Sequence, residues 1–319
     1  MPRTADDSSI GPVSTKPTGV VIGRFMPPHA GHEYLIRFAR AYAGHVTVFV
    51  CTLHHEPIPG ELRYRWMREL FPDATVVHVT EEIPEAARNH DGAYRIWARA
   101  IRERVDREPG YVFASEEFGL ELARELGCRF VPVDPRREAF PVSAAMIRDD
   151  PYANWKFLPR CVRPYYARKV VATGGLADEL AERYDTVVAS DYFAHHARLG
   201  LPPPATAGLA QVARGQLAIE AALLPEANRL LICDVDVLER VTAESRRAAV
   251  ARDETLSILG PLRDDFSHIV PAIVCSKTAP DPEYVSACAA AGWPTPVHTP
   301  TADDAAAAIA SQLGLSPTD

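Results

Sequence analysis

The chain has 319 residues, with 34 Lys and Arg against 42 Asp and Glu and a formal net charge of −8. This acidic balance gives no electrostatic footprint for nucleic acid, and no uninterrupted apolar run is long enough to span a membrane. We therefore expect neither a nucleic-acid partner nor a membrane partner, while the length suffices for two domains of ordinary size.

Residues 1–17 lack the apolar core of a signal peptide and predict a disordered tail on a cytoplasmic protein. From residue 18, short β-branched apolar runs alternate with segments of helical period. Strands are expected at 19–25, 45–52, 74–80, 111–115 and 129–134, and helices at 33–43, 61–71, 94–106 and 118–126. The alternation predicts a Rossmann-like α/β domain, a doubly wound parallel sheet with helices on both faces.

A helical linker at 146–169 leads to a second series of α/β signals. Its segments are 169–175, 176–184, 186–196, 210–224, 229–236 and 268–276. We therefore expect two α/β domains, at 18–165 and 166–319. Residues up to Arg168 carry a net charge of +1 and the remainder −9, so an anionic substrate is expected in the first domain.

The segment GRFMPPHAGHEYL, residues 23–35, follows one expected strand and opens a helix. Gly23 allows close backbone approach, and His29 and His32 stand where a helix N-terminus offers free N–H groups to a phosphate. Two imidazoles there can donate to oxygens on which charge builds up. The alternative is a pair of surface histidines in a turn, but the order of strand, loop and helix favours a site. The six cysteines form no CxxC pair, and no protein-held metal site is expected.

GRFMPPHAGH resembles the GxFxPxHxGH signature of the HIGH-type nucleotidyltransferase superfamily. Its members transfer a nucleotide monophosphate from an NTP to a small phosphorylated acceptor and release pyrophosphate. The segments 63–71, 111–119 and 133–170 are similar to the adenylyltransferase half of the nicotinamide-nucleotide adenylyltransferase/ribosylnicotinamide kinase family. The resemblance covers about residues 18–170 and implies a nucleotidyltransferase domain followed by a P-loop-kinase-like domain.

The resemblance also implies a set of site residues. The catalytic residues would be His29, His32 and Arg148; the nucleotide would lie against Gly23, Arg24, Phe25, Gly31, Ser115, Gly119 and Ser143; the acceptor would meet Arg63 and Trp97. Mg²⁺ would be held mainly by the phosphates. Ser143 and Arg148 match the ISxTxIR signature of the family, but Ala145 stands where Thr is usual. The helical period around Trp97 also fits a core position.

The second half departs further from this family. Residues 170–175, VVATGG, match the first strand of the kinase, but LADELAERYD follows directly and the Gly-Lys-Ser/Thr phosphate loop is absent. Asp234 and Asp236 stand where the family has carboxylates for Mg²⁺ and nucleoside. We therefore expect a degenerate kinase-like domain without kinase activity.

Three functions fit this pattern. The favoured one is transfer of CMP from CTP to a small phosphonate, similar to the phosphonoformate cytidylyltransferases of antibiotic pathways. The missing kinase loop, Ala145 and the Arg- and Ala-rich composition of a high-GC source favour it. The second is adenylyl transfer from ATP to nicotinamide mononucleotide. The third is a nucleotide-sensing regulator, but the segment before Thr18 is too short for the helix-turn-helix of such proteins. A homo-oligomer is expected with either transferase.

Overall fold

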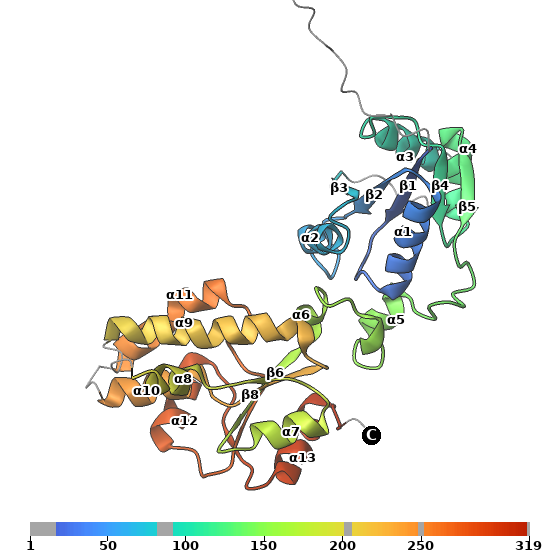
Figure 1. The fold of residues 1–319 in the computed structure, drawn as a ribbon. Helices are drawn as coiled ribbons and strands as arrows, with labels where there is room; N and C mark the ends of the chain where they lie inside the picture. The colour runs from blue at the N-terminus through green and yellow to red at the C-terminus, as the bar shows by residue number, and fades with distance from the viewer. Residues whose placement is uncertain (1–16, 82–91, 201–205, 248–251, 318–319) are drawn as a thin grey trace, which may run out of the picture. The chain divides into compact units, whose positions relative to one another are not determined.

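The computed structural model describes residues 17–81, 92–200, 206–247 and 252–317 (Figure 1). The chain divides into two compact units, residues 1–161 and 162–319, each built around a parallel sheet. This division lies a few residues before the expected boundary between 165 and 166. The expected tail at 1–17 lies almost wholly outside the described residues. No helix of the described segments has the length and apolar character needed to cross a bilayer.

The first unit is a doubly wound α/β domain with the strand order β3-β2-β1-β4-β5, all parallel. Its strands are β1 (Thr18–Gly23), β2 (His45–Cys51), β3 (Thr75–Val79), β4 (Tyr111–Ala114) and β5 (Arg129–Pro132). Its helices are α1 (Ala30–Tyr42), α2 (Gly60–Leu70), α3 (Ala93–Arg102), α4 (Phe118–Leu126), α5 (Ala144–Asp149) and the 3-10 turn η1 (Trp155–Phe157). The expected strands and helices of this half are confirmed, and α3 ends before the expected 106.

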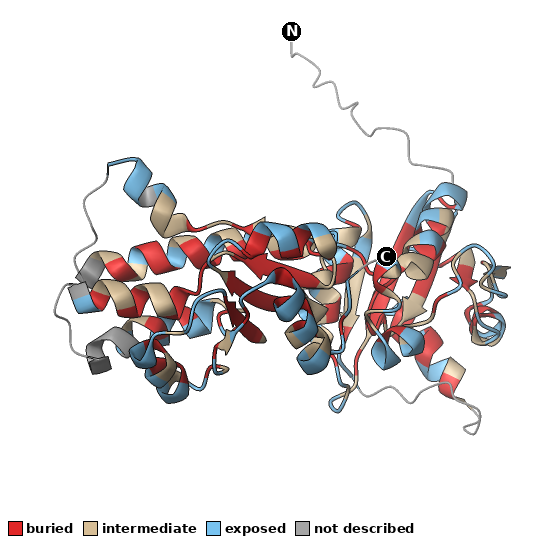
Figure 2. Cartoon of the chain, turned by 90° about the horizontal axis from the view of Figure 1, so that it is seen from below, coloured by how far each residue is buried: buried red, intermediate tan, exposed pale blue. Residues whose placement is uncertain are grey.

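Two cores form because successive side chains of β1 point to opposite faces of the sheet. Val21 packs with the apolar side chains of α1 and α2, and Val20 packs with those of α3 and α4. Figure 2 shows that the strands consist largely of buried residues. β1 lies at the centre of the sheet, with β2 and β3 added on one side of it and β4 and β5 on the other, so the direction in which the chain adds strands changes at β1. In open parallel sheets this is where ligands bind, beyond the carboxyl ends of the strands.

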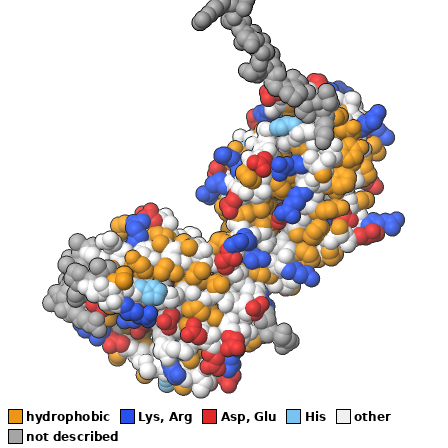
Figure 3. All heavy atoms as spheres, viewed as in Figure 1, with side chains coloured by type: hydrophobic (Ala, Val, Ile, Leu, Met, Phe, Trp, Pro, Cys, Tyr) orange, Lys and Arg blue, Asp and Glu red, His pale blue; other side chains and the backbone are white. Residues whose placement is uncertain are grey.

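The second unit has the parallel order β10-β9-β6-β8-β7. Its strands are β6 (Arg168–Thr173), β7 (Val188–Ala189), β8 (Leu230–Cys233), β9 (Ile273–Ser276) and β10 (Val297–His298). Its helices are α6 (Arg163–Tyr166), α7 (Ala177–Arg183), α8 (Tyr192–Arg198), α9 (Thr206–Leu223), the 3-10 turn η2 (Leu224–Glu226), α10 (Val237–Arg247), α11 (Arg252–Asp265), α12 (Pro282–Ala291) and α13 (Ala302–Leu313). On the face drawn in Figure 3, Asp and Glu side chains gather toward the lower edge of this unit.

Two segments differ from the sequence expectation. The linker at 146–169 is not one helical stretch: α5 ends at Asp149 before Pro151, and η1 ends before Pro159, because proline cannot continue a helix. The run 186–196 is divided as well. The two-residue strand β7 ends at Ala189, and Asp191 then caps α8, its carboxylate accepting the Ala194 N–H at 3.0 Å.

The connection after β6 is a tight turn. Gly174 and Gly175 adopt φ values of 78° and 84°, which favour glycine, and α7 begins at Ala177. A Cβ on Gly174 would lie 2.8 Å from the Cβ of Lys277, so the backbone here is closely covered. The long phosphate-binding loop that a P-loop requires has no chain to form it at this point.

Gly119 is explained by packing. It lies in the first turn of α4, where an added Cβ would stand 2.5 Å from Cε2 of Phe130 and 2.9 Å from Cβ of Ala114. Helix α4 can therefore approach β4 and β5 only with glycine at this position. The residue does not line the cavity described below, in contrast to the expectation that it meets the nucleotide.

We predict that Gly119→Ala lowers the free energy of unfolding by about 1–3 kcal/mol through overpacking. The comparison variant is Gly260→Ala in α11, where a Cβ would meet no atom within 4 Å apart from its chain neighbours. Because Pro261 follows and disfavours a helical residue with a Cβ before it, we expect a change below about 0.5 kcal/mol. Urea unfolding of the full chain measures both changes. An unchanged midpoint for Gly119→Ala would contradict the packing explanation.

Candidate functional site

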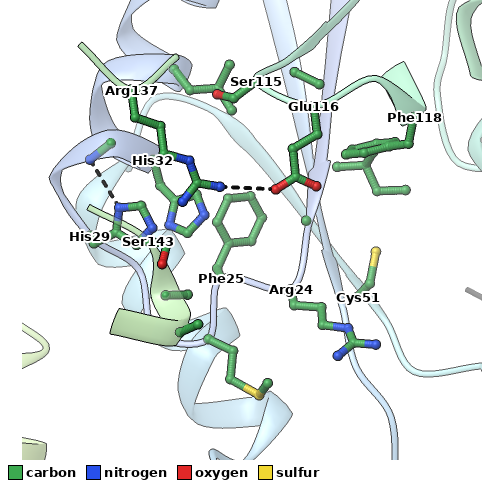
Figure 4. A pocket seen from close by; sticks show the side chains of 18 of the residues that line it. Arg24, Phe25, His29, His32, Cys51, Ser115, Glu116, Phe118, Arg137 and Ser143 are labelled. Carbon is green, nitrogen blue, oxygen red and sulfur yellow. Dashed lines mark hydrogen bonds and ion pairs between the residues drawn. The ribbon is translucent and has the colours of Figure 1, made fainter. Parts of the chain in front are cut away.

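A cavity of about 1160 Å³ opens at the carboxyl ends of β1 and β4. Ten of the twelve residues named from the sequence line it: Gly23, Arg24, Phe25, His29, Gly31, His32, Trp97, Ser115, Ser143 and Arg148. Arg63 and Gly119 do not. Figure 4 shows the two histidines, Arg137 and Glu116 around the centre of this cavity.

His29 is the N-cap of α1. Its Nδ1 accepts the N–H of Gly31 at 3.2 Å, so in the neutral ring the proton is on Nε2, which is left to donate to a ligand. A Cβ at position 31 would lie 3.1 Å from the His29 ring, so glycine lets the imidazole fold over the start of the helix without a tight contact. The cap thus fixes both the position and the tautomer of His29.

His32 lies one turn along α1, with its ring centroid 3.8 Å from that of His29. Phe25 follows β1 with a φ of 49°. Its ring makes an edge-to-face contact with that of His32, with 4.9 Å between the two ring centroids. The Nδ1 atom of His32 is buried and has no hydrogen-bond partner among the described residues. The two imidazoles, whose planes are tilted by 31° to each other, therefore line the cavity from the first turn of the helix.

Both histidines are neutral at pH 7. Burial, with a smaller contribution from the charge of Arg137, lowers the pKa of His29 from 6.5 to about 4. Burial, then the neighbouring His29 and then Arg137, lower the pKa of His32 well below its usual range. The fixed positive charge beside these rings comes from arginine, and the imidazoles act as neutral hydrogen-bond donors.

The short helix α5 brings a second group of residues to the cavity. Ser143 is its N-cap, and its Oγ accepts the Met146 N–H at 3.2 Å. Arg148 donates from Nη1 to the carbonyl oxygen of Met26 at 2.6 Å, which ties α5 to the loop between β1 and α1. Ala145 also lines the cavity and supplies no hydroxyl group there. The two parts of the expected triphosphate signature are therefore joined by a direct hydrogen bond.

Arg63 is not presented to the cavity. Its side chain is fully buried, with Nε donating to Ile58 O at 3.1 Å and Nη1 donating to the carbonyl oxygens of Cys51, at 3.0 Å, and of Arg24. Its Nη2 pairs with the carboxylate of Glu56. This arrangement makes Arg63 the residue that joins the loops after β1 and β2, in contrast to the expected contact with the acceptor phosphate.

Arg24 reaches the cavity from the same cluster. Its Nε lies 3.5 Å from Oε1 of Glu56, and its side chain is 40% exposed. Among the arginines near the start of the first unit, Arg24 is therefore better placed than Arg63 to meet an anionic acceptor. Glu56, which is itself paired with the buried Arg63, holds the Arg24 side chain in position.

The cavity wall also includes an aromatic and acidic region. Tyr94 and Trp97 of α3 and Phe118 of α4 line it together with the carboxylates of Glu81 and Glu116. Trp97 is 9% exposed and packs into the core under α3 and α4, so it belongs both to the core and to the cavity wall. Of these residues, only Trp97 is predicted from the sequence. The helical pattern of α3 shows which side chains are apolar but not which of them lie next to a ligand cavity.

The sequence also left Arg137 unassigned. It lies in the loop between β5 and α5 and lines the cavity beside the histidines (Figure 4). The signal that could have found it is weak, since two adjacent arginines after a strand are typical of a solvated loop.

The histidine pKa values predict a pH dependence of stability. The unfolded chain binds a proton on His29 near pH 6.5, whereas the folded chain accepts it only near pH 4. Acidification from pH 7 to 5.5 therefore favours the unfolded state, by about 1 kcal/mol for this residue. His29→Asn keeps an N-cap and should lose correspondingly less stability over this range. Urea unfolding at both pH values in a phosphate-free buffer measures the difference, and equal losses in the two proteins would contradict the assignment.

Comparisons with known proteins point in one direction. No family model matches the chain. It is 26% identical, over an alignment of 205 residues, to the trifunctional NAD biosynthesis/regulator protein NadR of Escherichia coli strain K12 and to that of Salmonella typhimurium. The alignments cover 57% of this chain, and the chain spans about half the length of these relatives.

A crystal structure of a NadR protein in complex with NAD and AMP-PNP superposes with a TM-score of 0.75 over 95% of this chain and 98% of that one, at 19% identity. A NadR structure in complex with NR gives the same TM-score and coverage at 18% identity. The chain thus has the fold of these structures, built here from two parallel-sheet α/β units, and is related in sequence to the NadR proteins over part of its length.

Proposed function

We propose that the chain transfers the adenylyl group of ATP to a mononucleotide that carries a pyridinium ring, forming a dinucleotide and releasing pyrophosphate. The observation that carries the proposal is the division of one cavity into two parts. One part combines the first turn of α1 with the two imidazoles and Arg148, and the other has aromatic and acidic walls.

The first part suits a triphosphate. The first turn of α1 presents the positive end of the helix dipole. Its Gly31 N–H is taken by the His29 cap, and the N–H groups of His32 and Glu33 bond the His29 carbonyl, so the side chains supply the donors to a ligand. The Nε2–H of His29 is oriented by its cap, and His32 stands beside it. Because these donors are fixed before the substrate arrives, they stabilise the charge that develops on the leaving pyrophosphate at little reorganisation cost.

The second part suits a cationic planar ring. Tyr94, Trp97 and Phe118 supply aromatic surface, and the carboxylates of Glu81 and Glu116 lie in the same wall, paired with Arg104 and Arg137. An aromatic wall attracts a cation placed over its face by about 0.5–2 kcal/mol. A small phosphonate would make no use of this region, whereas the pyridinium ring of a mononucleotide would.

The chemistry needs no covalent enzyme intermediate. An oxygen of the acceptor phosphate, ionised at neutral pH, attacks the α-phosphorus in line; the new P–O bond forms as the bond to the β-phosphate oxygen breaks and pyrophosphate leaves. The protein aligns the two phosphates and neutralises charge, which is the main source of catalysis in such reactions.

Mg²⁺ fits this site as a companion of the phosphates. The described residues include no group of three or more His, Cys, Asp and Glu side chains able to hold a metal ion. Mg²⁺ is commonly bound by substrate phosphates and one or two carboxylates rather than by a protein cage, and the carboxylates of Glu116 and Asp134 line the cavity. When bound, the ion would neutralise charge on the triphosphate.

A second candidate is CMP transfer from CTP to a small phosphonate. It is favoured by Ala145, which lines the cavity where the family signature has a hydroxyl-bearing Thr. The relatives named above are NAD biosynthesis proteins and favour adenylyl transfer. The two candidates share the triphosphate part of the site and differ in base and acceptor.

We propose further that the second domain has no kinase activity. The short Gly174–Gly175 turn supports this, because it leaves no loop whose N–H groups could surround a phosphate. We expect the full chain, incubated with ATP, Mg²⁺ and nicotinamide riboside, to form no phosphorylated riboside. Chromatographic detection of that product with catalytic turnover would contradict the proposal.

His29→Asn and His32→Ala should each lower the rate of pyrophosphate release by about 10²–10³-fold, because each removes a donor to the developing charge. His29→Asn keeps the helix cap, so circular dichroism and thermal unfolding at pH 7.5 should match the wild type. Arg65→Ala, a surface substitution outside the cavity wall, is the control. Turnover close to that of the wild type in both histidine variants would remove the basis for the site.

The choice of substrate is tested by pyrophosphate release with ATP or CTP against nicotinamide mononucleotide or phosphonoformate. We expect ATP with the mononucleotide to give a kcat/KM more than about tenfold above CTP with phosphonoformate, or about 1.4 kcal/mol in transition-state binding. Trp97→Leu keeps apolar bulk in the core but removes the aromatic face, and should raise the KM for the mononucleotide about fivefold with the KM for ATP unchanged. The reverse ranking of the substrate pairs would establish the second candidate.

A further inference from the structure

Arg137 is held in an unusual backbone conformation beside the two histidines. Its φ is 55°, in the left-handed region that non-glycine residues seldom adopt. The carboxylate of Asp134 fixes the loop by accepting the N–H groups of Glu138, at 2.8 Å, and of Ala139, at 3.2 Å. Residues kept in such conformations by a surrounding hydrogen-bond network cluster at ligand-binding sites. The loop therefore aims the Arg137 side chain in one direction.

That direction is the triphosphate part of the cavity. In Figure 4 the guanidinium group of Arg137 lies beside the rings of His29 and His32 and extends toward Glu116. Nη2 lies 3.2 Å from Oε1 of Glu116, and Nη1 donates to Val142 O at 3.3 Å. The positive charge is close enough to both imidazoles to disfavour their protonation.

The ion pair with Glu116 is suited to exchange. The Glu116 side chain is 64% exposed and that of Arg137 is 39% exposed, and ion pairs in such positions contribute little to stability because water and salt screen them. A guanidinium group binds phosphate oxygens in a bidentate manner, with stronger charge-assisted hydrogen bonds. A polyphosphate entering beside His29 would therefore compete effectively with a single carboxylate.

We propose that Arg137 binds the polyphosphate chain of the nucleotide and that Glu116 holds this guanidinium in place until the polyphosphate enters and displaces the carboxylate. The inference rests on the proposed triphosphate site. Glu116 then acts as an internal competitor: it keeps Arg137 positioned and at the same time weakens anion binding.

The neighbouring arginine is a matched control. Arg136 is 85% exposed, its guanidinium lies 3.8 Å from Glu138, and it does not line the cavity. It has the same charge and lies in the same loop as Arg137. Any effect of net charge or of loop stability alone should therefore appear in both positions.

Calorimetric titration of the full chain with inorganic tripolyphosphate, at constant ionic strength and pH 7.5, tests the proposal. We expect Arg137→Ala to raise the Kd at least about tenfold and Arg136→Ala to leave it within about twofold of the wild type. Glu116→Gln should lower the Kd about threefold or more, and should have no effect when combined with Arg137→Ala. Loss of the Glu116 charge alone also reduces repulsion of the anion, so the deciding observation is that the gain disappears when Arg137 is replaced as well.

The proposal is overturned if Arg137→Ala weakens binding no more than Arg136→Ala does, or if Glu116→Gln leaves the Kd unchanged or raises it. Thermal unfolding of each variant confirms that the folded protein is being titrated. Because tripolyphosphate binding needs neither an acceptor nor a reaction, this result is separable from the proposed function. Failure of nucleotidyl transfer with every acceptor would leave the expected Kd pattern intact.

Discussion

The hydrogen bond from the Gly31 N–H to Nδ1 of His29 is the contact on which the candidate site depends. It caps α1 with an imidazole where most helices use a hydroxyl or a carboxylate. It also decides which nitrogen carries the proton, so that the donor facing the cavity is Nε2–H. Glycine at position 31 favours the contact, because a Cβ there would lie 3.1 Å from the ring and would press it out of place.

A neutral capping histidine has a further consequence for binding. Because burial keeps His29 and His32 uncharged, the full positive charges along the cavity wall are those of Arg24, Arg137 and Arg148. Each of these arginines has a different partner. Arg24 lies beside the carboxylate of Glu56, Arg137 pairs with Glu116, and Arg148 donates to the carbonyl oxygen of Met26. Charge and neutral hydrogen-bond donors are thus supplied by separate groups.

Much of this arrangement can be predicted from the sequence. The strands, the helices and the positions of His29 and His32 follow from period and from the motif between β1 and α1, since a loop at that point must open at the edge of the sheet. The position of Arg63 does not follow. Three arginines at 63, 65 and 68 share one amphipathic helix, and only tertiary packing determines that Arg63 turns inward toward Glu56.

The roles of Arg137 and Gly119 also depend on tertiary contacts that the sequence does not reveal. The orientation of Arg137 depends on a left-handed backbone conformation and on an ion pair with Glu116, 21 positions earlier in the chain, neither of which has a local sequence signal. Gly119 matches a family motif, but its closeness to Phe130 is a property of helix packing on the sheet. The motif therefore assigns Gly119 to nucleotide binding, whereas its contacts assign it to the packing of α4.

The central claim is that the triphosphate of the nucleotide binds at the first turn of α1. A crystal structure of the full chain with a non-hydrolysable ATP analogue tests it most directly. The account predicts phosphate oxygens within hydrogen-bond distance of Nε2 of His29 and of the Arg137 guanidinium, with Glu116 released from that guanidinium. A triphosphate bound elsewhere in the chain, with His29 still facing an unoccupied cavity, would contradict it.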